Sequence, residues 1–96
     1  MELATEQKIA INTFIYNYFK SKKYNSFNGQ VISIKYVEDE LTILMKSNVF
    51  YVRFLKDFAR ELYVGGFTIL GGWETIKIYS FENKIIELKM IIQEDI

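Results

Sequence analysis

Three residue types are missing from this 96-residue chain: cysteine, histidine and proline. Without cysteine the chain can form no disulfide and has no thiolate nucleophile. Without histidine it lacks the usual general base and the commonest metal ligand. Without proline, no helix or strand contains an obvious internal breaker. These absences argue against an enzyme, and we predict no catalytic residues, no metal site and no cofactor.

The chain also lacks an excess of charge of either sign, because 12 basic residues balance 12 acidic ones. A protein dedicated to duplex nucleic acid usually carries a basic excess, since phosphate neutralisation drives binding. Balanced charge removes the repulsion between copies and so favours association. No apolar run approaches the roughly 20 residues that a membrane span requires. Residues 1–11 lack the basic start and apolar core of a signal peptide, so we expect no membrane interaction and a cytoplasmic location.

Apolar side chains, in contrast, are plentiful: hydrophobic residues make up 50% of the chain and aromatic residues 17%. A chain of this length forms one domain, residues 1–96, and buries only about two-thirds of its unfolded surface. Some of the large apolar side chains must therefore stay exposed or meet a partner.

The stretch from Ser47 to Gly66 is the clearest amphipathic segment. At about 100° per residue its apolar side chains fill one continuous arc of about half the circumference, and its charges fill the other. Such a broad stripe is typical of a helix that lies on a sheet and touches a second helix. Ser47 or Asn48 is suited to cap its start. Gly65 and Gly66 predict its end, where the backbone needs a positive φ.

The rest of the chain predicts one more helix and several strands. Residues 4–23 form the other predicted helix, with Glu2 and Glu6 near its start and lysines near its end, an order that the helix dipole favours. Alternating or apolar runs predict strands at residues 30–37, 41–46, 67–70, 73–81 and 85–92. Gly71 and Gly72, between two of these runs, predict a tight hairpin.

We expect an α+β fold: a two-layer sandwich with two helices on one face of a mostly antiparallel four- to five-stranded sheet, in the order α-β-β-α-β-β-β. The cleaner apolar sets should face the helices: Ile32, Ile34, Leu41, Ile43, Met45, Ile76, Ile78, Ile86, Leu88 and Met90. The opposite face should then hold Val31, Ser33, Lys35, Thr42, Leu44, Lys46, Trp73, Thr75, Lys77, Tyr79, Phe81, Glu87, Lys89 and Ile91.

This second face mixes lysines with aromatic rings, so we expect it to be the working surface. The candidate partner-binding residues are Trp73, Tyr79, Phe81, Lys35, Lys46, Lys77 and Lys89. The leading interpretation is a non-catalytic protein–protein interaction module that forms a homodimer, through this face or through an edge strand such as residues 85–92. Trp73 would anchor the contact, unless it merely covers the end of the sheet.

The alternative interpretation is a protein that binds single-stranded nucleic acid on the open sheet face. Aromatic rings stack on bases without sequence preference while lysines follow the phosphates. Ordinary cross-strand pairing of the lysines with Glu74 or Glu87 would explain the same residues without a ligand.

Two smaller patches lie on the predicted helices: Ile9, Tyr16 and Lys20 on the first, and Arg53, Lys56 and Arg60 on the second. Ile9 and Tyr16 stand two turns apart on one face, which makes a small candidate contact. The basic side chains of the second helix could touch phosphate or an acidic partner. They could equally form a solvated face, because Asp57 follows Arg53 by four residues and precedes Arg60 by three, and both spacings allow ion pairs along a helix.

Two other motifs point away from chemistry. The acidic run Glu38–Asp39–Glu40 could bind a hard cation, but so short a run is usually a solvated turn. The glycines of residues 65–72 lack the spacing of a phosphate loop and suit turns better.

The segment DELTILMKSNVFYVRFLKDF, residues 39–58, resembles the strand-to-helix passage in the N-terminal domain of the bacterial replication initiator DnaA. The resemblance rests on Leu41, Ile43, Asn48, Phe50 and Leu55. It implies a KH-like α/β arrangement and a role in recruiting other proteins, which agrees with the interaction interpretation. The chain has additional strands after this helix, and we assign no family.

Overall fold

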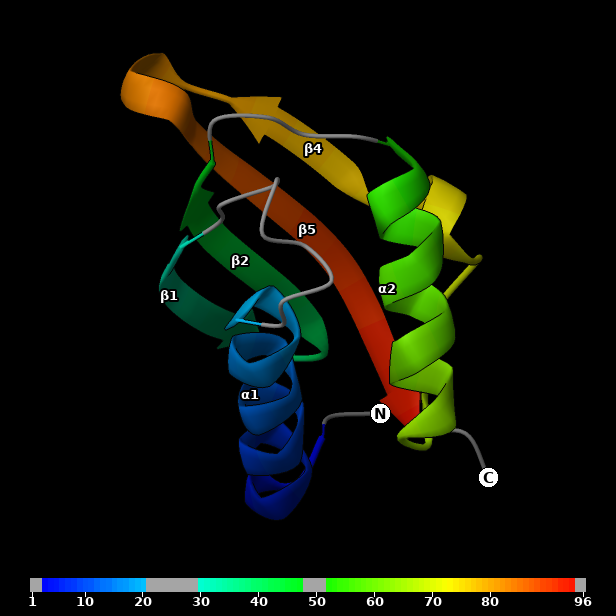
Figure 1. Cartoon of the computed structure of the whole chain (residues 1–96). Coiled ribbons are helices and arrows are strands. Elements are labelled where there is room, and N and C mark those ends of the chain that lie inside the picture. The colour runs from blue at the N-terminus through cyan, green and yellow to red at the C-terminus, as the bar shows by residue number, and fades with distance from the viewer. Residues whose placement is uncertain (1–2, 21–29, 48–51, 95–96) are drawn as a thin grey trace.

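The computed structural model describes residues 3–20, 30–47 and 52–94 and forms one α+β sandwich (Figure 1). The elements are α1 (Thr5–Lys20), β1 (Gln30–Val37), β2 (Glu40–Lys46), α2 (Val52–Val64), β3 (Phe67–Ile69), the 3-10 turn η2 (Trp73–Thr75), β4 (Lys77–Ser80), the 3-10 turn η3 (Glu82–Lys84) and β5 (Ile85–Glu94). The expected class and element order are confirmed. Residues 21–23 of the predicted first helix, and the predicted cap at Asn48, lie outside the described residues.

The antiparallel sheet is built around β5, which is its longest strand. β2 pairs with β5 along one side, from Glu40 opposite Ile91 to Lys46 opposite Ile85, and β1 pairs with β2. On the other side, β4 pairs with the first half of β5 and β3 with the second half. The prediction that residues 85–92 form an edge strand is therefore wrong, because β5 has neighbours on both sides.

One hydrophobic core fills the space between the sheet and the two helices, which both lie in front of it in Figure 1. Ile86, Leu88, Met90 and Ile92 of β5 are buried, while the residues between them are half-buried. This alternation is the period of two that a strand imposes on its side chains. Each fully buried aliphatic side chain contributes about 1.5–3 kcal/mol relative to exposure.

Aromatic rings join the two helices above the sheet. Tyr18 of α1 lies 5.3 Å from both Phe54 and Phe58 of α2, measured between ring centroids. Phe14 lies 5.6 Å from Phe58. Such offset and edge contacts add about 0.5–1.5 kcal/mol per pair to the burial of the rings. The predicted contact of the second helix with both the sheet and the first helix is thus confirmed.

A β-bulge in β1 corrects the predicted facing of two residues. The register shifts between Val31 and Ser33, so that Val31 stands opposite Met45 and packs against the core. Ile32, which simple alternation places on the helix side, is instead 48% exposed. An extra residue in one strand reverses the facing of everything beyond it.

The glycines act as predicted at one end of α2 and differently at the next turn. Gly66 takes a φ of 94° and its backbone N–H donates to Tyr63, which ends the helix. Gly71 and Gly72 also take positive φ, but they lead into η2 and not into a hairpin. β3 and β4 do not form a hairpin with each other, because they follow one another along the same side of β5.

Candidate functional site: the outer face of the sheet

The sheet face opposite the helices, which we call the outer face, is built from alternate residues of β1, β2, β5 and β4. Residues directly opposite each other in antiparallel strands point to the same face, so the register orders the face into rows. The lysine row contains Lys35, Thr42, Lys89 and Lys77, one from each strand. The glutamate row beside it contains Ser33, Leu44, Glu87 and Tyr79.

Two further rows complete the face. Beyond the lysine row stand Val37, Glu40 and Ile91. Beyond the glutamate row stand Lys46 and Ile85. Phe81 extends this last row, because its backbone N–H donates to the Ile85 carbonyl at 2.8 Å. Its extended backbone, with φ −123° and ψ 174°, continues the alternation of Lys77 and Tyr79.

No helix or strand among the described residues covers the outer face, which points away from the viewer in Figure 1. Lys35, Lys46, Lys77, Tyr79 and Phe81 are exposed, Phe81 by 54%. Leu44, Ile85 and Ile91 are half-buried by the side chains around them. The two middle rows of the face therefore hold the charged pair Lys89 and Glu87 and the half-buried Leu44, and the two outer rows hold Ile85 and Ile91. The other lysines and the aromatic rings lie toward the edges of the face.

Lysines outnumber carboxylates on the outer face, which carries four lysines and only two glutamates, Glu87 and Glu40. Lys89 Nζ lies 3.9 Å from Glu87 Oε1, two residues away on the same strand. Lys89 also stands directly opposite Lys77, a like-charge pair that opposes folding slightly. The Lys89–Glu87 ion pair lies along β5, and the residues directly opposite Glu87 are Leu44 and Tyr79, so the register does not place Glu87 opposite a lysine as cross-strand pairing would require. The face keeps a positive excess.

Six of the seven predicted partner-binding residues share the outer face, but Trp73 does not. Trp73 begins η2, packs against the core and lies on the helix side of the sheet. The segment after Gly72 turns before β4 begins, so the alternation that predicted its position does not extend back to residue 73. Trp73 consequently cannot anchor a contact through the outer face.

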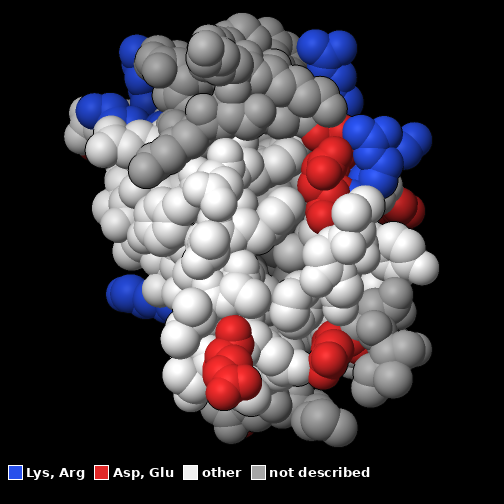
Figure 2. All heavy atoms as spheres, turned by 60° about the horizontal axis from the view of Figure 1, so that its bottom comes forward, with Lys and Arg blue, Asp and Glu red and all other residues white. Residues whose placement is uncertain are grey.

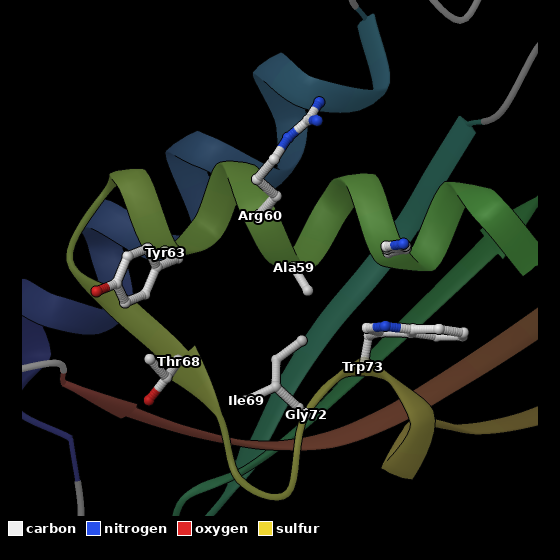
Figure 3. Close-up of a pocket in the computed structure, with 8 residues that line it drawn as sticks. Ala59, Arg60, Tyr63, Thr68, Ile69, Gly72 and Trp73 are labelled. Carbon is white, nitrogen blue, oxygen red and sulfur yellow. The ribbon is translucent and has the colours of Figure 1, made fainter.

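Trp73 instead lines a groove of about 320 Å³ between α2 and the turn that follows β3 (Figure 3). Ala59, Ile69 and Trp73 point toward the cavity, and Arg60 points away from it. The Arg60 guanidinium pairs with Asp57 and lies 4.0 Å from Glu61. Lys56 also lines the groove. An apolar wall with a cation at its rim suits an apolar group that carries a negative charge.

The secondary residues do not form one surface. Ile9 and Tyr16 are exposed on α1, as predicted, and the side chain of Lys20 lies outside the described residues. Arg53, Lys56 and Arg60 are exposed on α2. Asp57 accepts hydrogen bonds from Arg60 and, at 2.9 Å, from Tyr18, so this carboxylate holds the two helices together.

Apolar exposure also occurs at the end of the molecule where α2 stops. Tyr63 and Val64 are exposed there, and Leu70 is exposed at the far end of β3. Figure 2 shows this end, where uncharged side chains cover the centre and most charged ones stand toward the rim. The exposed apolar side chains are therefore spread over this end, the outer face and α1.

Sequence reasoning missed Glu40 and Ile85, which both belong to the outer face. Glu40 precedes the predicted strand 41–46 by one residue and continues the alternation of Thr42 and Leu44. Ile85 begins the predicted strand 85–92 and shares the alternation of Glu87 and Lys89, but it is absent from the predicted outer set. Within residues 3–20, 30–47 and 52–94, no three acidic side chains gather closely enough to hold a metal ion. In the same ranges, no helix is both long and apolar enough to cross a membrane.

Comparison with protein-family models, with curated proteins and with solved structures finds no match to this chain. The resemblance of residues 39–58 to the replication-initiator domain stays a prediction. The functional argument accordingly depends on the geometry of the outer face.

Proposed function

We propose that the protein is a non-catalytic binding module that self-associates as a homodimer through its outer face. The observation that carries this proposal is the composition of that face. Half-buried Leu44 lies in the glutamate row, half-buried Ile85 and Ile91 flank the lysine and glutamate rows, and no described element covers these side chains. Packing two such sheets together is a common way to remove apolar side chains from water.

The size of the face indicates how strong such a dimer can be. Four strands about 4.8 Å apart and four rows about 6.7 Å apart give about 500 Å² per copy. Two copies would bury about 1,000 Å², the lower limit for a specific interface. The balanced net charge of the chain adds no general repulsion. We therefore expect a dissociation constant in the micromolar range, on the order of 1–100 µM.

Light scattering on a sizing column tests this function. Across about 5–500 µM protein, chosen to bracket that range, the mass of the wild type should rise toward twice the 11.4 kDa of one chain. Leu44→Lys should keep the chain monomeric, because it places a charge in the middle of the face. Val64→Lys is the matched control at a site 78% exposed on the helix side. A wild type that stays monomeric throughout would contradict the homodimer.

A second function, binding of single-stranded nucleic acid, is favoured by one specific observation. Three lysines, Lys35, Lys89 and Lys77, lie in one row across the sheet. Lys89 and Lys77 are neighbours in this row, and Thr42 lies between Lys35 and Lys89. Tyr79 follows Lys77 along β4, Phe81 comes directly after β4, and both rings are exposed. A strand crossing the row could place phosphates on the lysines and bases on the rings.

Anisotropy of a fluorescently labelled short oligonucleotide tests this second function. Quenching of Trp73 is a poor readout, because that ring lies on the other side of the sheet. Lys77→Gln and Tyr79→Ala should each weaken binding, and Lys56→Gln on α2 should not. Absence of any anisotropy change at low salt would eliminate nucleic acid as a ligand of this face.

A further inference from the structure

The rows of the outer face are complementary to themselves. We propose that two copies pack outer face to outer face about a twofold axis that crosses the strands between the lysine row and the glutamate row. This inference rests on the proposed homodimer and specifies its geometry. At the centre of the contact, Lys89 of each copy meets the partner's Glu87.

The pairing follows from the register. A twofold axis that lies between two sheets and runs across their strands places each strand over its own copy and reverses the order of the rows. The lysine row of one copy then lies over the glutamate row of the other. On β5, Lys89 lies over the partner's Glu87, and by symmetry Glu87 lies over the partner's Lys89. On β2, Leu44 lies over the partner's Thr42.

The charges distinguish this axis from the other twofold arrangement. A twofold axis parallel to the strands would keep the order of the rows and lay one lysine row over the other. Lysines would then face lysines in a low-dielectric contact, which is costly. The axis across the strands instead creates a ring of four alternating charges, because Lys89 already lies 3.9 Å from Glu87 of its own chain. Both side chains are partly buried, at 34% and 24% exposure, so solvent screens the ring only in part.

The outer two rows support the same axis. The axis brings the row of Lys46 and Ile85 over the row that contains Glu40 and Ile91 in the partner. Isoleucine then meets isoleucine, and one lysine meets one carboxylate at each end. Sheets packed face to face are rotated by about 30°, which shifts side chains at the ends of the face by roughly one strand. The specific pairs are therefore assigned only to the centre, where the rotation moves them little.

Charge reversal at the central pair tests the inference. Glu87→Lys alone places four lysines at the axis, and Lys89→Glu alone places four glutamates there. Each single variant should weaken self-association at least tenfold. The two single variants mixed in equal amounts should form a heterodimer, because every lysine then faces a glutamate. The double variant E87K/K89E restores the alternation and should form a homodimer again.

Sedimentation velocity measures all of these associations. The charge-matched controls are Glu61→Lys and Lys56→Glu on α2, which should leave the wild-type association unchanged. Circular dichroism should show the wild-type fold in every variant, since positions 87 and 89 lie outside the core. The milder variants Glu87→Gln and Lys89→Gln remove one charge without introducing repulsion, and each should weaken the dimer several-fold.

The outcomes separate the inference from the function on which it rests. A monomeric wild type would overturn the homodimer itself. A wild-type dimer that both single variants preserve would leave the homodimer standing and overturn the proposed packing. The third outcome is that each single variant is monomeric and that the two do not associate when mixed. The outer face would then still be the interface, but the twofold axis across the strands would be wrong.

Discussion

Tyr36 places a hydroxyl group in the packing between the sheet and α1. Its hydroxyl donates a hydrogen bond to Asn12 Oδ1 at 2.8 Å. The Lys8 ammonium lies 5.4 Å from the centre of its ring. Burial raises the pKa of Tyr36 to about 12. Tyr18, whose hydroxyl donates to Asp57, has its pKa raised mainly by burial and then by that carboxylate. Both tyrosines therefore favour the neutral form in the folded protein.

A raised tyrosine pKa predicts a loss of stability at high pH. An unfolded tyrosine titrates near pH 10, so the contribution of Tyr36 to the free energy of unfolding is complete below about pH 10. It is lost as the pH rises through the folded value of about 12. Tyr36→Phe should destabilise the protein at pH 7 by about 0.5–1.5 kcal/mol, the usual net value of one hydrogen bond. The difference from the wild type should shrink above pH 10.

Urea unfolding at pH 7, 9 and 11 would measure this difference. Tyr63→Phe is the control, because the hydroxyl of Tyr63 has no hydrogen-bond partner among the described residues and its side chain is exposed. A Tyr36→Phe deficit that stays constant from pH 7 to pH 11 would show that the titration of this residue is not linked to folding.

At the scale of the element, the turn between β3 and β4 depends on Gly71. Its φ is 79°, and a Cβ built on it would lie 2.6 Å from Thr75 Cγ2. Thr75 is held in place because its hydroxyl lies 2.8 Å from the Leu70 carbonyl and 2.7 Å from the Gly72 carbonyl. This turn lets β3 and β4 share one side of β5, so it positions Lys77 and Tyr79 on the outer face.

Substitution of Gly71 by alanine should therefore lower the free energy of unfolding by more than the strain of the positive φ alone would. We expect Gly71→Ala to lower the free energy of unfolding by about 2–4 kcal/mol, the sum of backbone strain and a steric clash. Gly66→Ala separates the two effects, because Gly66 has a φ of 94° but no atom within 4 Å of its added Cβ. It should cost only about 1–2 kcal/mol.

A double substitution identifies the clash itself. Thr75→Ser removes Cγ2 and keeps the hydroxyl, so G71A/T75S should recover part of the loss seen in Gly71→Ala. Chemical denaturation of the four chains gives the coupling free energy directly. If Gly71→Ala and Gly66→Ala lower the free energy of unfolding equally, the Thr75 methyl group moves aside and the clash contributes nothing.

At the scale of the whole molecule, the two proposed functions respond differently to salt. The homodimer buries aliphatic side chains around one ring of paired charges, so its dissociation constant should change only a few-fold between about 50 and 500 mM salt. A single strand bound by the three lysines of the lysine row should lose about 100-fold in affinity over the same range, because counterions are released.

Parallel titrations of self-association and of oligonucleotide binding measure these two slopes. If self-association falls as steeply as phosphate binding is expected to, the dimer is held by charge and not by Leu44, Ile85 and Ile91. If the oligonucleotide affinity is insensitive to salt, the lysine row does not contact phosphate.

Local patterns in the chain were sufficient to predict the two layers and most of the outer face. Alternation along β2 and β5 separates core residues such as Leu88 from outer residues such as Lys89, because strand geometry acts between neighbours in sequence. Six candidate residues were placed on one face for this reason. The end of α2 at Gly66 was predictable because a positive φ has a strong residue preference.

Only the tertiary structure decided which strands pair, and therefore which candidate residues become neighbours. Nothing in the local pattern shows that β3 and β4 pair with β5 and not with each other, or that a bulge reverses Val31 and Ile32. Trp73 was misplaced because a 3-10 turn interrupts the alternation before β4. The lysine row exists because contacts between distant segments set the register, and such contacts are not encoded in the periodicity of any one segment.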